Sequence, residues 1–318
     1  MTQQEGQTSV LLENVSSLIR SKVKATNVSL VEKFAKTLYS NMSTEDLASR
    51  NDSDLYGAAL SLWNSLEKHT DDTALIRVFN PELANNGWQS SHTIVEIIAK
   101  DMPFLVDSVR MALARENIVS HLLLHSPLKI KRDKDGLISA LSGMKTEQES
   151  DSNKTVFFIE IDRQSDKSVI ASIKKELESV LADVSVAVED WLAIKDKLVS
   201  ISKALPKRKG IKNKTEVKET VEFLDWLAKD NFTLMGYRQY DLSPIKGDYQ
   251  LTGVADTSLG MMKLSDETKS RRLSDLPEVA RKEAHSDNLL ILTKTNSLSR
   301  FLSAGLPRTN SDFRMLLD

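Results

Sequence analysis

Apolar residues in the N-terminal part of the chain recur at helical spacing from residue 8 to about residue 70. Intervals of three and four place such residues on one face of a helix. Two polar stretches, which begin at Ser43 and Asn51, resemble helix starts because a capping side chain precedes acidic residues. We therefore expect an N-terminal helical segment. The residues that share its apolar faces are Val31, Phe34, Leu38, Leu55, Ala58, Leu62 and Leu66.

The pattern changes to that of β-strands at Thr73. Residues 74–79 form a strand-like run that stops at an Asn-Pro turn signal, and residues 93–99 are apolar at nearly every position. Continuous apolarity is typical of a strand that is buried on both faces or lies at the centre of a sheet. We expect residues 93–99 to be such a strand.

A helix is expected to follow this strand. Pro103 suits the first helical turn, because the N–H that it lacks would have no partner there, and Asp101 or Met102 would be the cap. Apolar residues at helical spacing then continue to Glu116. The pattern therefore predicts a strand that leads through a short turn into an amphipathic helix.

Five further elements follow in this part of the chain. They are an extended segment at 118–132, a candidate hairpin strand at 137–141, a strand at 155–161, a helix at 169–181 and a short strand at 184–188. Apart from the hairpin strand, the order from residue 93 is strand, helix, strand, strand, helix, strand. This is the split βαβ arrangement of ferredoxin-like folds, in which two helices cover one face of an antiparallel sheet. The predicted fold class is α+β.

A basic stretch that contains Pro206 and Gly210 marks a domain boundary. A smaller α+β unit is expected beyond it. Its elements are a helix at 219–228, a strand at 232–242 that pairs with one at 248–254, and a strand at 288–293. The predicted division of the chain is a helical segment at 1–72, the α+β module at 73–190, a helix with the basic linker at 191–216, and a second α+β domain, incomplete or truncated, at 217–318.

Composition and charge narrow the class of protein. The 318 residues include 43 Lys and Arg against 45 Asp and Glu, so the formal net charge is -2 and gives no general attraction to nucleic acid or to an anionic membrane. There is no cysteine, which excludes disulfides and cysteine-bound metals and fits a reducing compartment. No secretory signal is visible, and no run approaches the ~20 apolar residues that span a bilayer. We expect a soluble cytoplasmic protein.

The sequence contains no motif of a cofactor-binding or catalytic site. Among its 11 glycines there is no G-x-G-x-x-G or Walker pattern, so no nucleotide-binding loop is predicted, and Gly260 is assigned to a turn. His121 and His125 would share a helix face as metal ligands, but in a strand they lie about 13 Å apart at ~3.3 Å per residue. We expect ordinary half-buried or surface histidines and no metal site.

Two other clusters have a simple interpretation. The basic residues at 207–214 would suit phosphate contacts, but they lack interleaved aromatic residues, and a solvated linker is favoured. Asp225, Asp230 and Asp241 are assigned to caps and turns, because paired carboxylates act as acid and base only in a cleft that shifts their pKa values. No catalytic residue and no cofactor-binding residue is therefore predicted.

Three blocks of the sequence resemble one family. The first runs from Trp88 through VEIIAKDMPFLVDSVRMALARENIVSHLLLH, the second is FLDWLAKDNFTLMGYRQYDL at 223–242, and the third, which is looser, combines LGMMK at 259–263 with LILTKTNSLSR at 290–300. They are similar to the N-terminal part of the large-subunit, NAD-specific glutamate dehydrogenases of bacteria. The resemblance covers residues 73–300, and the sequence departs from the family pattern after Arg300.

The resemblance implies a region without catalysis of its own. The family has very long polypeptides, whose catalytic and NAD-binding domains lie far C-terminal to such a stretch and oxidise L-glutamate to 2-oxoglutarate and ammonia. Its N-terminal part contains ACT-like βαββαβ modules, which in many enzymes bind amino acids and regulate. NAD is thus implied for the parent enzyme only. The implied partners are the rest of the polypeptide, a second copy of the chain and an amino-acid effector, with neither nucleic acid nor membrane.

The turn between the first strand and the first helix is the candidate ligand-binding site. Its residues are Asp101, Met102, Pro103, Phe104 and Asp107. A helix N-terminus favours a carboxylate. ACT modules that bind amino acids usually carry D-x-P-G-x-L here, and glycine allows close approach of a ligand. Phe104 stands at that position, and its ring would fill the space or pack into the core. Three hypotheses stay open: a regulatory or assembly region, an amino-acid sensor, and an oligomerisation scaffold that pairs through its sheet edges.

Overall fold

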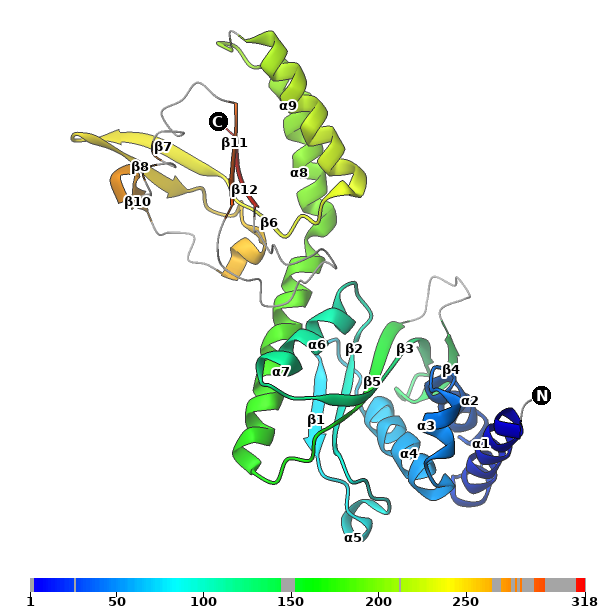
Figure 1. Ribbon diagram of the computed structural model, residues 1–318. Coiled ribbons are helices and arrows are strands. Elements are labelled where there is room, and N and C mark those ends of the chain that lie inside the picture. The colour runs from blue at the N-terminus through cyan, green and yellow to red at the C-terminus, as the bar shows by residue number, and fades with distance from the viewer. Residues whose placement is uncertain are drawn as a thin grey trace. The chain divides into compact units, whose positions relative to one another are not determined.

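A five-stranded antiparallel sheet, in the order β1-β2-β5-β3-β4, lies at the centre of the first of two units in this computed structural model (Figure 1). The units span residues 1–181 and 182–318. The structure describes residues 3–25, 27–143, 152–211, 213–264, 270–275, 278, 281, 289–294 and 313–317. The strands of the sheet are β1 (Leu75–Phe79), β2 (Thr93–Lys100), β3 (Ser120–Arg132), β4 (Ile138–Gly143) and β5 (Ser152–Ile161).

The split βαβ arrangement is present in this sheet. Helix α6 (Leu105–Arg115) connects β2 to β3, and β5 lies between these two strands and is antiparallel to both. Strand β4 pairs back onto β3 as the hairpin that the sequence predicts. Strand β1 precedes the split βαβ elements in the chain and forms the edge next to β2. The α+β fold class is therefore confirmed, with the order of strands now defined.

The short strand predicted at 184–188 is wrong. Helix α7 (Lys167–Glu189) runs through this segment without interruption. Val184 and Ala187 are buried and continue the helical spacing of Ile173, Leu177 and Val180. The apolar stripe of the helix thus outweighs the local β propensity of the valines, which is weak and depends on context.

Two layers of helices cover the sheet on its two faces (Figure 1). One layer is formed by α1 (Gln3–Lys22), α2 (Val28–Tyr39), α3 (Thr44–Ala48) and α4 (Asp52–Lys68), and the other by α6 and the first part of α7. Phe34 and Trp63 meet edge to face in the N-terminal layer, with ring centroids 5.6 Å apart. Strand β2 is buried at every position except its last, as its continuous apolar pattern predicts.

The N-terminal helices share one core with the sheet. Residues of α1, α2 and α4 form a single buried cluster with residues of β2, β3 and β5. Both predicted helix starts are confirmed: Ser43 accepts a hydrogen bond from the N–H of Asp46 at 3.1 Å, and Asn51 accepts one from the N–H of Asp54 at 2.7 Å. The guanidinium of Arg132 on β3 donates to the carbonyls of Leu66 and His69, each at 2.8 Å, and so satisfies the C-terminal end of α4.

The second unit begins within α7 and contains a pair of packed helices and small sheets. Leu198 of α8 packs with Leu224 of α9 and with Leu227 and Ala228, which follow it. The elements are α8 (Trp191–Ala204), η1 (Leu205–Lys207), α9 (Lys214–Trp226), η2 (Leu227–Asn231), β6 (Gly236–Tyr237), β7 (Tyr240–Ile245), β8 (Asp248–Gly253), β9 (Leu259–Gly260), η3 (Met261–Leu264), β10 (Arg271–Arg272), η4 (Leu273–Asp275), β11 (Leu290–Lys294) and β12 (Phe313–Leu317).

The predicted hairpin of this unit is confirmed, with a different start. Strands β7 and β8 pair antiparallel from Tyr240 with Gly253 to Ile245 with Asp248. The single strand predicted at 232–242 is divided into β6, which pairs with β9, and β7. The helix predicted at 219–228 begins earlier, at Lys214, because Asn213 caps it by accepting from the N–H of Glu216 at 3.2 Å. None of the helices in the described residues is long and apolar enough to span a membrane.

Candidate functional site

The turn predicted to bind a ligand connects β2 to α6 in the first unit. The helix begins two residues later than predicted: Leu105 is its first residue and Phe104 its cap, so the expected start at Pro103 with Asp101 or Met102 as cap is wrong. The Phe104 side chain makes no capping hydrogen bond, since it has no acceptor. Its carbonyl accepts the first helical hydrogen bond, from the N–H of Ser108 at 3.0 Å.

Phe104 adopts a backbone conformation that favours glycine. Its φ is 70° and its ψ is 0°, in the left-handed region. A side chain in this region costs roughly 1–2 kcal/mol, because its Cβ approaches the following carbonyl. The side chain is 37% exposed, so the expectation that its ring packs into the core is wrong. The turn therefore keeps the backbone shape of a glycine position and presents an aromatic ring toward solvent.

Asp101 and His125 interact electrostatically behind this turn. Burial raises the pKa of Asp101 and lowers the pKa of His125, and each group opposes the shift of the other. His125 lies on β3, as predicted; its Nε2 shares a hydrogen bond of 2.8 Å with Thr155 Oγ1, and its ring lies 4.6 Å from that of Phe157. Asp107, in the first turn of α6, is exposed. The structure thus joins a residue of the predicted turn to a histidine that the sequence assigned to no site.

The two histidines of β3 have separate surroundings. His121 Nε2 donates to Asp162 at 2.7 Å, and its ring lies 4.7 Å from the ring of His92. His92 Nδ1 in turn lies 3.7 Å from a carboxylate oxygen of Glu160. In the part of the chain that the structure describes, no group of three or more His, Asp or Glu side chains is arranged to hold a metal ion.

The other predicted clusters contain local contacts of the second unit. Asp225 accepts a hydrogen bond from Ser202 Oγ at 2.6 Å, and Asp230 forms an ion pair with Lys195 at 2.8 Å. The N–H of Gly260 donates to Asp190 at 2.7 Å. These contacts connect α8 and its cap to the residues around it. Among the described residues, no hydrogen bond or ion pair joins two of Asp225, Asp230 and Asp241 through a shared partner.

Two ion pairs hold buried carboxylates of the sheet, one with the N-terminal helical layer and one between neighbouring strands. Arg50 pairs with Glu160 of β5 through both nitrogens of its fork, and the Glu160 side chain is 2% exposed. Arg77 of β1 pairs with Glu96 of β2 at 2.7 Å, and the Glu96 side chain is 1% exposed. Burial raises the pKa of Glu96, and Arg77 opposes this shift. Both glutamates stand inside otherwise apolar strands, TIVEIIA and TVFFIEI. A charged residue within such a strand is a sequence signal that could have identified Glu96 and Glu160 as buried and paired.

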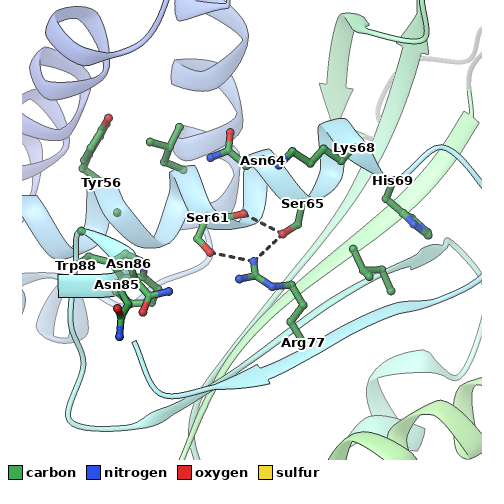
Figure 2. A pocket seen from close by; sticks show the side chains of 14 residues that line it. Tyr56, Ser61, Asn64, Ser65, Lys68, His69, Arg77, Asn85, Asn86 and Trp88 are labelled. Atoms are coloured by element: carbon green, nitrogen blue, oxygen red, sulfur yellow. Dashed lines mark hydrogen bonds between the residues drawn. The ribbon is translucent and has the colours of Figure 1, made fainter. Parts of the chain in front are cut away.

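A cleft of about 670 Å³ lies between α4, β1 and the segment that contains α5 (Leu83–Asn86). Helix α4 contributes Ser61, Ser65 and Lys68 to its lining, and β1 contributes Arg77. Figure 2 shows Arg77 reaching from β1 toward the two serines. The nitrogen Nη1 of Arg77 donates to Ser65 Oγ at 2.7 Å and to Ser61 Oγ at 3.2 Å, in addition to Glu96. The sequence did not indicate this cleft, because its residues are distributed over three elements.

A close contact between Gly57 and Trp88 forms one end of the cleft. A Cβ atom at Gly57 would lie 2.3 Å from the Cβ of Trp88, so only glycine permits this approach of the two segments. Trp88 is buried and contacts the rings of Phe79 and Phe158, each at 6.3 Å between centroids. At this end of the cleft Trp88 is therefore packed between α4 and the sheet.

Comparison with known proteins gives a family for the first unit. Residues 34–177 match the family described as glutamate dehydrogenase, ACT1 domain. An NAD-specific glutamate dehydrogenase of Halomonas elongata is 31% identical over 264 residues, which are 83% of this chain and 16% of that protein. The protein of the same description from Pseudomonas aeruginosa is 32% identical over 231 residues, which are 73% of this chain and 14% of that protein. The chain therefore spans less than a fifth of the length of these relatives.

Proposed function

Residues 34–177 are a glutamate dehydrogenase ACT1 domain, and on this premise we propose that the chain is a non-catalytic regulatory or assembly region of an NAD-dependent glutamate dehydrogenase. The family match carries the proposal. Two long relatives with the same description support it, because both align with most of this chain over a small fraction of their own length.

The parent reaction in this proposal is the oxidation of L-glutamate with NAD and water to 2-oxoglutarate, ammonia and NADH. The printed sequence has no glycine-rich nucleotide-binding pattern, and no catalytic residue is assigned to it. Binding of NAD and chemistry are therefore assigned to the rest of the polypeptide. The parent enzyme is placed in the cytoplasm, in keeping with a chain that has no cysteine.

Assembly is proposed through a second copy of the chain or the rest of the polypeptide. In the described sheet, β1 and β4 are edge strands, and edges are natural sites of pairing. Phe104 adds an exposed aromatic ring on a turn whose backbone favours glycine. Retained strain of this kind is typical of positions where a side chain has a role in contacts.

A second candidate function is amino-acid sensing at the same turn. The N-terminus of α6 favours a carboxylate through its free N–H groups. Asp101 and Asp107 lie beside it and would select a ligand that also carries an ammonium group. Phe104 favours the assembly role, because its side chain occupies the position where ACT modules that bind amino acids usually have glycine.

Turnover by the purified chain tests the non-catalytic assignment. Formation of NADH from L-glutamate and NAD would be followed by absorbance, with a full-length relative as the positive control. We expect no turnover by this chain, and calorimetry with NAD should give no binding heat. A rate close to that of the control enzyme would refute the proposal.

Light scattering and calorimetry separate the two candidate roles. Self-association that rises with protein concentration supports assembly, and a strictly monomeric chain at high concentration contradicts it. A panel of amino acids titrated into the chain tests sensing. Binding that is lost in Asp101→Asn and kept in Asp135→Asn, a change in an exposed turn, would favour sensing, and the absence of binding across the panel would exclude it.

A further inference from the structure

We propose that the cleft between α4, β1 and α5 binds a small organic dicarboxylate. The site is separate from the turn at Asp101–Asp107 and goes beyond the proposed regulatory or assembly role. Its residues come from the N-terminal helical layer and the edge strand, all within the first unit.

Arg77 is held in place by one of its nitrogens and leaves the others available. Glu96, Ser61 and Ser65 all accept from Nη1, and the guanidinium carbon lies 4.6 Å from the centre of the Phe79 ring. Within the residues that the structure describes, Nη2 and Nε of Arg77 make no hydrogen bond, and the side chain is 37% exposed. This edge of a guanidinium matches a carboxylate with two parallel hydrogen bonds. Because the group is already fixed, binding costs little conformational entropy.

Lys68 adds a second positive charge to the same lining. It is exposed, and in the described part of the chain its ammonium forms no ion pair. Asn64, one turn before it on α4, and Asn86 on the opposite side contribute neutral amides (Figure 2). No Asp or Glu is among the described residues that line the cleft. Arg77 is already paired with Glu96, which lies outside the lining, so the lining offers the free edge of its guanidinium together with the ammonium of Lys68. These two donor groups favour a ligand with two carboxylates.

The apolar part of the lining favours an organic molecule over an inorganic anion. Leu60 and Leu75 line the cleft together with the rings of Tyr56 and Trp88. A ligand with a short carbon chain can contact these side chains while its two ends reach Arg77 and Lys68. The absence of a lining carboxylate also gives no partner for an ammonium group, so we infer a dicarboxylate without an amino group. A volume of about 670 Å³ is ample for four or five carbons.

Calorimetry with succinate tests the site on the complete chain. Saturable binding is expected, and it should weaken as salt is added, because screening reduces the attraction between separated charges. Succinamide, which has the same skeleton without charge, and inorganic phosphate, which has charge without a skeleton, should bind at least about tenfold more weakly, as expected when one charged hydrogen-bonding group is lost. Failure of succinate to bind, or equal binding of phosphate or succinamide, would overturn the proposal.

Two variants with a matched control locate the binding. Arg77→Gln combined with Glu96→Gln removes the ion pair as a unit, so no single buried charge is left, and should weaken succinate binding about tenfold or more. Lys68→Gln changes an exposed residue whose ammonium forms no ion pair with the described residues, and it should weaken succinate binding about threefold. Lys134→Gln, in an exposed turn, should change nothing. Thermal unfolding of each variant confirms that it is folded. Unchanged binding in the first two variants, or equal weakening in Lys134→Gln, would refute the assignment.

The proposed dehydrogenase role can fail independently of this one. These titrations measure binding to the chain itself and need neither NAD nor turnover. A chain that binds succinate but shows unexpected turnover would refute only the non-catalytic assignment. A chain without turnover that does not bind succinate would refute only the dicarboxylate site.

Discussion

Arg50 and Glu160 form a two-point ion pair that fastens the turn between α3 and α4 to the central strand β5. Both nitrogens of the arginine fork donate, one to each carboxylate oxygen, and the distance from Nη2 to Oε2 is 2.7 Å. The carboxylate is fully enclosed, while the guanidinium side chain is 25% exposed. The position of the helical layer on the sheet therefore depends on one charged contact as well as on apolar packing.

Removal of one partner of this pair should destabilise the chain strongly. Arg50→Met leaves the Glu160 carboxylate buried without its cation, and we expect a loss of about 3 kcal/mol in the free energy of unfolding. Combining it with Glu160→Leu should recover a large part of this loss, because no uncompensated charge is left. Urea unfolding measures both variants. Glu178→Gln, which breaks the exposed pair with Lys174, should change stability by less than about 0.5 kcal/mol. A double variant as unstable as Arg50→Met would contradict the explanation.

Glycine at position 104 should relieve the strain of the turn between β2 and α6. We expect Phe104→Gly to be more stable than Phe104→Ala by about 1 kcal/mol, since a residue with a Cβ is disfavoured at positive φ. Comparison of these two variants removes the contribution of the ring itself. Chemical denaturation gives both values. If the alanine variant is the more stable one, the left-handed conformation at this position is not a source of strain.

Gly57→Ala should destabilise the chain although alanine is the better helix former. The added Cβ would overlap Trp88, and overpacking costs about 1–3 kcal/mol against a helix-propensity gain of about 1 kcal/mol. In a Trp88→Gly background the overlap is removed, because glycine also lacks the Cβ that lies nearest, and the same change should become stabilising. A double-mutant cycle measures the coupling between the two positions. Additive effects would show that the two residues do not meet closely.

Protonation of His125 should reduce stability in mild acid. Burial lowers the pKa of this group in the folded chain below the unfolded value of about 6.5, so the unfolded chain binds more protons. Its contribution to stability is therefore complete above that pH and is lost as the pH falls toward the folded pKa. Urea unfolding at pH 7.5 and pH 5.5 tests this. In His125→Gln the difference between the two pH values should shrink, and an unchanged difference would assign the pH dependence to other groups.

The pattern of apolar residues predicted most elements of the first unit. Strand β2 was recognisable from its nearly continuous apolar residues, which the structure buries at every position except the last. Helices α2 and α4 were recognisable because their apolar residues repeat at helical spacing. The segment at 184–188 was wrongly predicted as a strand. Its alternating valines resemble a strand, but Val184 and Ala187 also continue a helix face. A local pattern does not decide between these periods when the segment is only five residues long.

The sequence pattern alone did not predict which distant segments pair with each other. The edge position of β1 depends on which strand it meets, and the contact of Arg77 with Glu96 joins residues that are apart in the chain. The turn at Asp101 was found because it is local, whereas the cleft combines α4, β1 and α5 and has no continuous motif. Glutamates within apolar strands were the one local sign of the buried charge pairs.

The N-terminal helices determine where a fragment that contains this domain can begin. The family match begins at residue 34, inside α2, yet Val15, Ile19 and Val31 belong to the same buried cluster as the sheet. A fragment that starts at residue 34 would cut a helix in the middle and expose the apolar face that α1 covers. Residues before the matched segment therefore belong to the same hydrophobic core, and we expect that a fragment which folds by itself has to include α1.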